Sequence, residues 1–313
     1  MSTGTLEMHD VCATRPISLT AKLAAYFELT KPKIAVMVLL AVAIAYLLGT
    51  RAEQSVPLGD GMRLLWTLVG TALVAASASA VNQWIERDQD SLMPRTRNRP
   101  LPSGTLNSTE VLTFAALTLA GGLLILAART NLLATLMAVG TWICYTLLYT
   151  PLKTRSTSNT AIGAVAGAWP VLIGWAAVEA PIDFGPASLR LLTLFLVLYL
   201  WQFPHFMAIA WIYRRDYALA GMRMLTVCEP SGKHAGSLAV RTALVLLPVS
   251  LLPCAGIAAW WGVAATLGLG LLYFVAAYRF QQAATDQTAR RLLHVSLVYL
   301  PLWMVVLWLL PVA

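Results

Sequence analysis

Three oxygen-bearing side chains follow one another at four-residue intervals near the end of a long apolar block: Asn82, Glu86 and Asp90. Four residues advance an α-helix by about 400°, so the side chains drift by only about 40° per step and share one face. One amide oxygen and two carboxylates suit a hard cation such as Mg²⁺. Asp88 points away from this face and is expected to pair with Arg87 or another arginine. The spacing therefore predicts a magnesium site.

A basic segment containing two prolines follows directly, with arginines at every second position: Arg95, Arg97 and Arg99. The prolines disfavour a helix and favour an extended loop. Arginine contacts phosphate oxygens in a bidentate manner. Carboxylates for a metal beside arginines for phosphate point to a diphosphate substrate. A charged loop beside a membrane is the alternative for the arginines, but Asn82 and Glu86 lie at the apolar boundary, where a polar group without a function is costly.

A second polar group follows a later apolar block and contains Arg214, Arg215 and Asp216. Asp216 is a candidate ligand for a second Mg²⁺, and the two arginines are candidate phosphate contacts. No carboxylate stands at position 220, so this site is poorer in ligands than the first.

His205 lies within that same apolar block, directly after Pro204 and next to Phe203 and Phe206. Two interpretations stay open for it. It is either a buried, hydrogen-bonded core residue or a contact for a flat acceptor that carries a metal. The residue type alone favours the core interpretation, and a proline-induced kink that opens a cavity beside His205 would add weight to the second.

A third polar stretch carries Tyr145 and Tyr149, which share a helical face, followed by Lys153 and Arg155. The two cations are placed to reach the same phosphate. Aromatic faces stabilise cations, so the two tyrosines could stabilise an allylic carbocation as it forms. An interfacial aromatic belt is the alternative for either tyrosine. Lys31, at the start of the first apolar block, is either another phosphate contact or a membrane anchor.

Long apolar segments must position these groups. Of the 313 residues, 58% are hydrophobic and only 12% charged, whereas a soluble domain carries roughly a quarter charged residues. Blocks of about 16–20 apolar residues are long enough to cross a hydrocarbon core of roughly 30 Å as helices. The ten-residue alternation of a transmembrane barrel is not seen. We expect an all-α membrane protein with nine spans, near 34–49, 64–84, 111–128, 132–149, 161–178, 191–211, 243–258, 263–277 and 292–310.

The positive charges predict the orientation of these spans. Eighteen of the 22 Lys and Arg residues fall in the N-terminal tail and in alternate loops on the same side. The positive-inside rule places that side in the cytoplasm, with the N-terminus inside. The net charge of +8 is therefore a topology signal, and no nucleic-acid partner is expected. Residues 1–28 are expected to form a cytoplasmic tail and residues 29–313 one transmembrane domain.

Together these residues resemble the UbiA-type intramembrane prenyltransferase family, and within it the branch whose acceptor is haem. The resemblance covers nearly the whole membrane region and rests on residues 29–32, 82–86, 98–102, 149–153, 201–206, 213–217 and 220–221. The stretch from Asn82 to the acids is typical of the superfamily. The Phe203 to Phe206 stretch and the Asp216-Tyr217 pair are similar to the haem branch.

The resemblance implies a nine-helix bundle around a central cavity that opens near the cytoplasmic face of a bacterial inner membrane. It also implies Mg²⁺, farnesyl diphosphate as donor and haem b as acceptor, with the haem and prenyl group contacted by His205, Phe203, Phe206, Tyr145 and Tyr149. Expected partners are a haem A synthase or an oxidase assembly protein. Many relatives carry two aspartates in the second motif, and Ala220 here puts a symmetric two-metal site in doubt.

Two other functions compete with this interpretation. One keeps the donor chemistry but uses an aromatic quinone precursor as acceptor. The other is a transporter, because polar groups within a membrane also mark transport paths. A transporter is expected to carry polar groups near the middle of several spans, whereas here they gather at the cytoplasmic ends.

Overall fold

The structure is a computed structural model that describes residues 18–52, 61–180, 182, 185–255 and 259–311. Every regular element in this part of the chain is helical, and nine stretches are long and apolar enough to cross a membrane. Six of the nine are formed by single helices: α2 (Pro32–Ala52), α3 (Gly61–Ile85), α5 (Ser108–Arg129), α10 (Pro186–Ile212), α14 (Trp260–Gln282) and α15 (Asp286–Leu309). The all-helical fold with nine spans is therefore confirmed within the described residues. The central cavity stays a prediction.

The other three spans are composite. They consist of α6 (Leu132–Ile143), the π-helix η1 (Cys144–Tyr149) and α7 (Thr150–Leu152); of α8 (Asn159–Ala168) and α9 (Val171–Ala177); and of α13 (Lys233–Leu251) with the 3₁₀ turn η2 (Leu252–Cys254). Shorter helices lie outside the spans: α1 (Leu19–Leu29), α4 (Arg87–Leu92), α11 (Arg214–Leu219) and α12 (Leu225–Cys228).

Some boundaries differ from the expected ones. The seventh span begins at Lys233 rather than near residue 243, because the small residues Ala235, Gly236 and Ala239 pack inside the bundle and extend the helix past the apolar block. The eighth span begins at Trp260 rather than near residue 263, because Trp260 belongs to the first turn of α14. Residues 1–17 of the expected tail lie outside the described residues, and the rest of the tail contains α1.

Polar side chains cap the N-termini of several helices that follow a loop. Asn107 accepts a hydrogen bond from the Glu110 backbone N–H, and Glu110 accepts one from the Asn107 backbone, which forms a capping box at the start of α5. Asn131 caps α6 and also donates to the Ala176 carbonyl of α9 at 2.7 Å. Such caps pair backbone donors that would otherwise be unsatisfied in the first turn.

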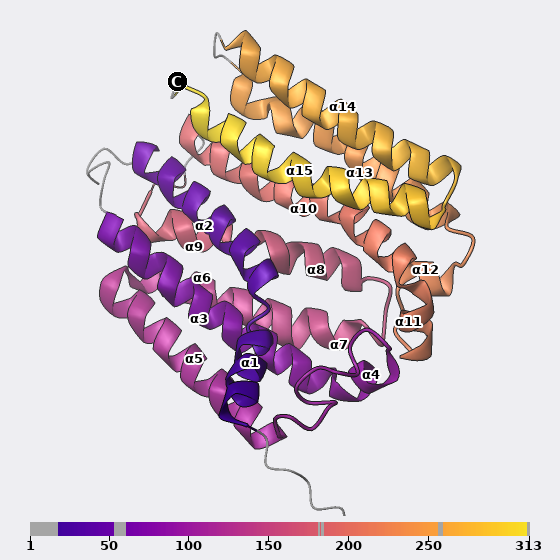
Figure 1. Cartoon of the computed structure of the whole chain (residues 1–313). Helices are drawn as coiled ribbons and strands as arrows, with labels where there is room; N and C mark the ends of the chain where they lie inside the picture. The colour runs from indigo at the N-terminus through magenta and orange to yellow at the C-terminus, as the bar shows by residue number, and fades with distance from the viewer. Residues whose placement is uncertain (1–17, 53–60, 181, 183–184, 256–258, 312–313) are drawn as a thin grey trace, which may run out of the picture.

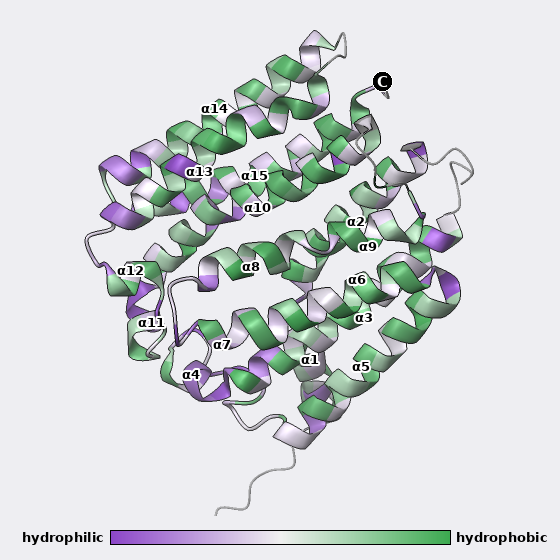
Figure 2. Cartoon of the chain, turned by 180° about the vertical axis from the view of Figure 1, so that it is seen from behind, coloured by the Kyte–Doolittle hydropathy of each residue, from purple (hydrophilic) through white to green (hydrophobic). Residues whose placement is uncertain are grey.

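The polar loops gather at one end of the bundle. Figure 1 places α4, α7, α11 and α12 together at the end that faces away from the C-terminus. Figure 2 shows hydrophilic residues concentrated around α4, α11 and α12, while the middle of the bundle is mainly hydrophobic. Helix α1 docks at this end, because Lys22 forms an ion pair with Glu110 at 2.5 Å and Tyr26 packs on Phe114. We call this the site end.

Close crossings between spans depend on glycine. A Cβ atom on Gly174 of α9 would lie 2.2 Å from the Val42 carbonyl oxygen and 2.9 Å from the Tyr46 backbone nitrogen, both on α2. Backbone atoms of a packed helix cannot move aside as a flexible side chain would. Small residues at such crossings let membrane helices approach closely.

We expect Gly174→Val to lower the stability of the protein by about 3 kcal/mol or more, because the side chain forces α2 and α9 apart. Thermal unfolding of detergent-solubilised protein, followed by size-exclusion chromatography, measures the effect. Gly268→Ala in α14 is the control, since a Cβ there meets nothing within 4 Å. Equal melting temperatures for Gly174→Val and the wild type would show that the α2–α9 crossing is not tightly packed.

Candidate active site

The three predicted metal ligands lie at the corner where α3 passes into α4. Asn82 is in the last turns of α3, Glu86 directly precedes α4, and Asp90 lies within α4. The helical hydrogen bonds continue across the corner, from Glu86 N to Asn82 O at 3.0 Å and from Asp90 N to Glu86 O at 2.7 Å. The side chains therefore stay in one column, and their exposed fractions are 0%, 7% and 1%. Two carboxylates are thus buried at the end of a membrane span.

Each of these polar side chains faces a cation from a different segment. Lys31 Nζ donates to Asn82 Oδ1 at 2.5 Å. Lys153 Nζ lies 2.7 Å from Glu86 Oε1. Arg99 Nη1 donates to Asp90 Oδ2, also at 2.7 Å. Burial of the carboxylates is tolerated because each has a charged partner.

The cations and carboxylates form one electrostatic cluster. Burial, followed by the charge of Arg99, lowers the pKa of Lys31 to about 7. Burial by itself raises the pKa of Glu86, but Lys153 and Lys31 outweigh burial and hold that pKa below its usual value. Burial likewise lowers the pKa of Lys153, and Glu86 outweighs it and holds the pKa well above its usual value. Glu86 and Lys153 are therefore both charged at neutral pH.

The backbone at Lys31 is held in an unusual conformation. Its φ is 48°, in the left-handed region, at the junction between α1 and α2. A residue other than glycine pays on the order of 1 kcal/mol or more for this conformation, which persists only where the surroundings enforce it. The docked α1 and the Asn82 hydrogen bond supply that enforcement. The hydrogen bond to Asn82 places the ammonium group of Lys31 at the polar column of α3.

The donor set fits a hard divalent cation. Asp90 Oδ1 is buried and has no hydrogen-bond partner among the described residues. An amide oxygen and two carboxylates at neighbouring positions match the oxygen ligands of Mg²⁺, which fills its other sites with water and substrate phosphate. No cluster of three His, Cys, Asp or Glu side chains occurs within the described ranges.

The arginines of the first loop differ in exposure. Arg99 is partly buried, while Arg95 and Arg97 are exposed. The loop is a series of turns and not the extended segment expected from its prolines. The Arg95 guanidinium packs over the Tyr213 ring at 4.4 Å, and Met93 packs with Met222 and Met224. The first loop therefore contacts the second polar segment.

The third polar stretch contributes an aromatic wall. Tyr145 and Tyr149 lie in the π-helix η1, with ring centroids 5.5 Å apart. The Lys153 ammonium lies 4.7 Å from the centre of the Tyr149 ring. Short π-helices occur frequently at functional sites, because the extra residue per turn re-aims the side chains. A Cβ on Gly163 would meet Tyr149 Cε2 at 2.6 Å, so this glycine makes room for the ring.

The second polar segment, residues 214–216, has other contacts than the column of Asn82, Glu86 and Asp90. Arg214 donates to Asp286 of α15 at 2.8 Å and packs on the Trp211 ring, while Arg215 is exposed. Asp216 is partly buried and has no side-chain partner within the described part of the chain. Exposed Arg155 accepts a hydrogen bond from the Arg223 side chain through its carbonyl oxygen, at 3.4 Å.

His205 lies in an aromatic environment between α10 and α15. Its ring stacks on Trp201 with centroids 4.7 Å apart, and its Nδ1 lies 2.7 Å from Ser296 Oγ. The α10 helix continues through Pro204 without a break. Phe203 is buried against Tyr199, with centroids 5.2 Å apart, whereas Phe206 is partly buried. The hydrogen-bonded and the acceptor-contacting interpretations of His205 are compatible, since only one ring nitrogen is used.

Comparison with known proteins decides the family. A sequence profile described as the UbiA prenyltransferase family matches residues 34–310. The chain belongs to the UbiA prenyltransferase family. Protoheme IX farnesyltransferase of Solibacter usitatus is 38% identical over 282 residues, which cover 88% of this chain and 95% of the relative. The protein of the same name from Opitutus terrae is 39% identical over 293 residues, covering 93% and 95%.

A plant relative is longer than this UbiA-family chain. The mitochondrial protoheme IX farnesyltransferase of Arabidopsis thaliana is 37% identical over 281 residues, which cover 89% of this chain but only 63% of the relative. The chain therefore spans less than two thirds of that protein.

Solved structures share the UbiA fold. The structure of digeranylgeranylglyceryl phosphate synthase matches with a TM-score of 0.72 at 20% identity, covering 92% of this chain and 97% of that one. A UbiA homologue from Archaeoglobus fulgidus, bound to GPP and Mg²⁺, matches with a TM-score of 0.61 at 17% identity, covering 90% and 99%. These likenesses support the arrangement of the nine spans.

The structure adds Thr150 to this UbiA-family site and gives a place in it to Tyr217, which its sequence motif singled out only by resemblance. Thr150 is buried and accepts a hydrogen bond from Asn82 Nδ2 at 3.1 Å while donating to the Tyr145 carbonyl at 2.8 Å. It thereby turns the Asn82 amide oxygen toward Lys31. Burial raises the pKa of Tyr217, and its ring packs against the cluster that contains Met93 of the first loop, so the second segment contacts that loop through this ring. The only signal for Thr150 in the sequence was its position directly after Tyr149 in the third polar stretch.

Proposed function

We propose that this chain is a Mg²⁺-dependent enzyme that transfers the farnesyl group of farnesyl diphosphate to haem b, giving haem O and diphosphate. The observation that carries the proposal is the buried column of Asn82, Glu86 and Asp90 with three cations around it. Relatives named protoheme IX farnesyltransferase support the acceptor, because they match nearly the whole chain.

The donor end is assigned from charge. Asn82, Glu86 and Asp90 would hold Mg²⁺, which supplies charge neutralisation to the diphosphate leaving group when bound. Lys31, Arg99 and Lys153 bind diphosphate oxygens and stabilise the negative charge that develops there. Exposed arginines around the loops, Arg95, Arg97, Arg155 and Arg215, attract the anionic substrate. Arg214 joins α11 to α15, and Asp216 is the candidate ligand for a second Mg²⁺.

Farnesyl transfer begins with ionisation of the donor. The bond between farnesyl C1 and the diphosphate oxygen breaks, and the oxygen keeps the electron pair. The π electrons of a haem vinyl group attack the allylic cation and form a carbon–carbon bond. Water then adds to the remaining cation, with release of one proton. Tyr145 and Tyr149 present aromatic faces that stabilise the cation, and the apolar spans keep bulk water away from it.

His205 is assigned to the acceptor. Ser296 Oγ donates to the Leu293 carbonyl at 2.6 Å, so it accepts the hydrogen bond from His205 Nδ1–H. The proton then sits on Nδ1, and Nε2 keeps a lone pair, which is the form that contacts a haem iron. Phe203 and Phe206 supply apolar surface near the same place. Ser296 is therefore a positioning residue for His205.

We expect Ser296→Ala to weaken haem binding roughly tenfold, because a hydrogen-bond partner that orients a histidine ligand typically contributes on this scale. Haem titration by optical absorbance measures the dissociation constant, and the KM for farnesyl diphosphate is expected to stay unchanged. Ser250→Ala is the control, since Ser250 is an equally buried serine that donates to the Leu247 carbonyl. An unchanged haem spectrum and affinity in Ser296→Ala would remove Ser296 as the positioning residue of His205.

The distribution of positive charge indicates how the protein is oriented in the membrane. The site end carries most of the basic loops, so we place it and the N-terminus on the cytoplasmic side of a bacterial inner membrane. A haem A synthase or an oxidase assembly protein would accept the product there.

Product analysis tests the proposed function. Purified protein in nanodiscs is incubated with farnesyl diphosphate, Mg²⁺ and either haem b or an aromatic quinone precursor, and products are identified by mass spectrometry. Haem O formation that requires Mg²⁺ is expected. Prenylation of the quinone precursor alone would move the protein to the competing prenyltransferase function, and absence of any diphosphate release with intact, folded protein would refute the enzyme.

A further inference from the structure

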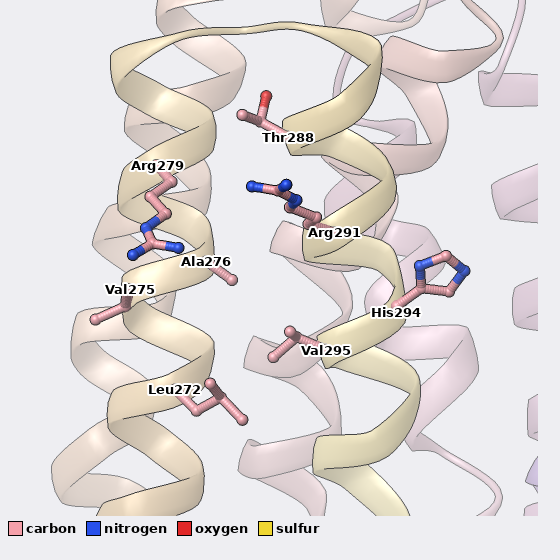
Figure 3. Close-up of a pocket in the computed structure, with 8 residues that line it drawn as sticks. All are labelled: Leu272, Val275, Ala276, Arg279, Thr288, Arg291, His294 and Val295. Carbon is pink, nitrogen blue, oxygen red and sulfur yellow. The ribbon is translucent and has the colours of Figure 1, made fainter.

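A groove runs between α14 and α15 on the side of the bundle remote from α3. Figure 3 shows its lining, and it encloses about 270 Å³. Arg279 and Thr288 with Arg291 lie toward the loop that joins the two helices, and Leu272, Val275 and Val295 lie deeper along them. The groove is thus charged at one end and apolar at the other.

The charged end carries two guanidinium groups without a counter-charge. Arg279 and Arg291 are exposed, and neither guanidinium group has a hydrogen-bond, ion-pair or aromatic partner within the described part of the chain. The nearest acid along α15, Asp286, is already paired with Arg214. Thr288 donates to the Ala283 carbonyl, so its hydroxyl closes the top of the groove and does not neutralise the arginines.

The apolar end lies at membrane depth. Seven residues separate Leu272 from Arg279, which corresponds to about 10 Å along an α-helix. Leu272 and Val275 are both exposed side chains within a membrane span, so they face acyl chains. The groove therefore places two positive charges at the membrane surface, directly above its apolar end.

We propose that this α14–α15 groove binds an anionic phospholipid, such as phosphatidylglycerol, with its phosphate between Arg279 and Arg291 and an acyl chain along Leu272, Val275 and Val295. Basic pockets between membrane helices recognise anionic headgroups, and each arginine contributes about 1 kcal/mol at the membrane surface. The lipid connects α14 to α15, which the Arg214–Asp286 ion pair links to α11. The proposal is independent of the acceptor assigned above.

Native mass spectrometry of the full-length protein, with added phosphatidylglycerol or phosphatidylcholine, tests the proposal. The wild type is expected to retain phosphatidylglycerol selectively and to melt at a higher temperature with it. Arg279→Gln with Arg291→Gln is expected to bind it roughly 25-fold more weakly, at about fivefold per arginine. Arg290→Gln is the matched control, because Arg290 is an exposed arginine of the same helical turn that does not line the groove.

A second variant separates a groove from a general attraction of charge. Val275→Trp fills the apolar end and leaves both arginines in place, so phosphatidylglycerol retention is expected to fall in this variant as well. The proposal is overturned if the double variant binds as the wild type does, or if Arg290→Gln loses as much affinity. Equal retention of phosphatidylcholine, or displacement of the lipid by inorganic phosphate or farnesyl diphosphate, would overturn it too.

Discussion

Asp90→Asn is expected to reduce haem O formation roughly 100- to 1000-fold, because it removes one of the two carboxylate charges that would hold the Mg²⁺ that neutralises the diphosphate leaving group. The substitution keeps the volume of the side chain. Asp90 Oδ1 has no hydrogen-bond partner among the residues that the structure describes, so little of its interaction with the surrounding protein is lost at that atom. The remaining partner, Arg99, is partly exposed and can be solvated.

The control for Asp90→Asn lies two residues away. Asp88 is exposed and pairs with Arg87 at 3.7 Å, so Asp88→Asn is expected to leave turnover within a factor of two of the wild type, on the order of a surface ion pair's small contribution. Turnover is measured by mass spectrometry of haem O in purified protein, with elution profiles to verify folding. Wild-type turnover in folded Asp90→Asn would rule out the proposed metal role.

Lys153→Met is expected to lower turnover roughly 100-fold, because one side chain supplies both a positive charge for the diphosphate and the partner of Glu86. It lies 2.7 Å from Glu86 Oε1 and packs over the Tyr149 ring. Breaking a buried ion pair by removing one partner costs about 3–5 kcal/mol, so the melting temperature is expected to fall as well.

Rescue by arginine separates the two roles of Lys153. Lys153→Arg keeps the charge, and we expect it to recover most of the lost stability and part of the turnover, because the guanidinium differs in shape from the ammonium. Lys233→Met serves as the matched control, since Lys233 is an exposed lysine in the first turn of α13. Full activity in Lys153→Met, measured over a range of farnesyl diphosphate concentrations, would contradict the assignment of Lys153 to the diphosphate.

In the candidate site, the sequence predicted which residues share a helical face but not which residues pair with one another. The four-residue spacing of Asn82, Glu86 and Asp90 predicted one helical face, and the hydrogen bonds across the α3–α4 corner preserve that face. The basic residues Lys31, Arg99 and Lys153 were candidates from their types and positions. Their one-to-one pairing with Asn82, Asp90 and Glu86 came only from the structure.

Some helices could be predicted from the sequence, whereas others depend on contacts between distant residues. Apolar length alone located the nine spans, because crossing a hydrocarbon core requires a fixed number of apolar residues. It did not locate α1, the π-helix at Tyr145 and Tyr149, or the early start of α13. These depend on contacts such as Lys22 with Glu110, and on small residues that pack against neighbouring helices.

The sequence by itself determined that the chain crosses a membrane many times and that Asn82, Glu86 and Asp90 share one helical face at the end of a span. Hydropathy and helical spacing are properties of neighbouring residues, so they can be read along the chain. The tertiary structure alone decided that Thr150 orients Asn82, that Ser296 holds His205, and that Arg279 and Arg291 share a groove. Residues far apart in sequence meet only through the packing of whole spans, and no local pattern encodes which spans become neighbours.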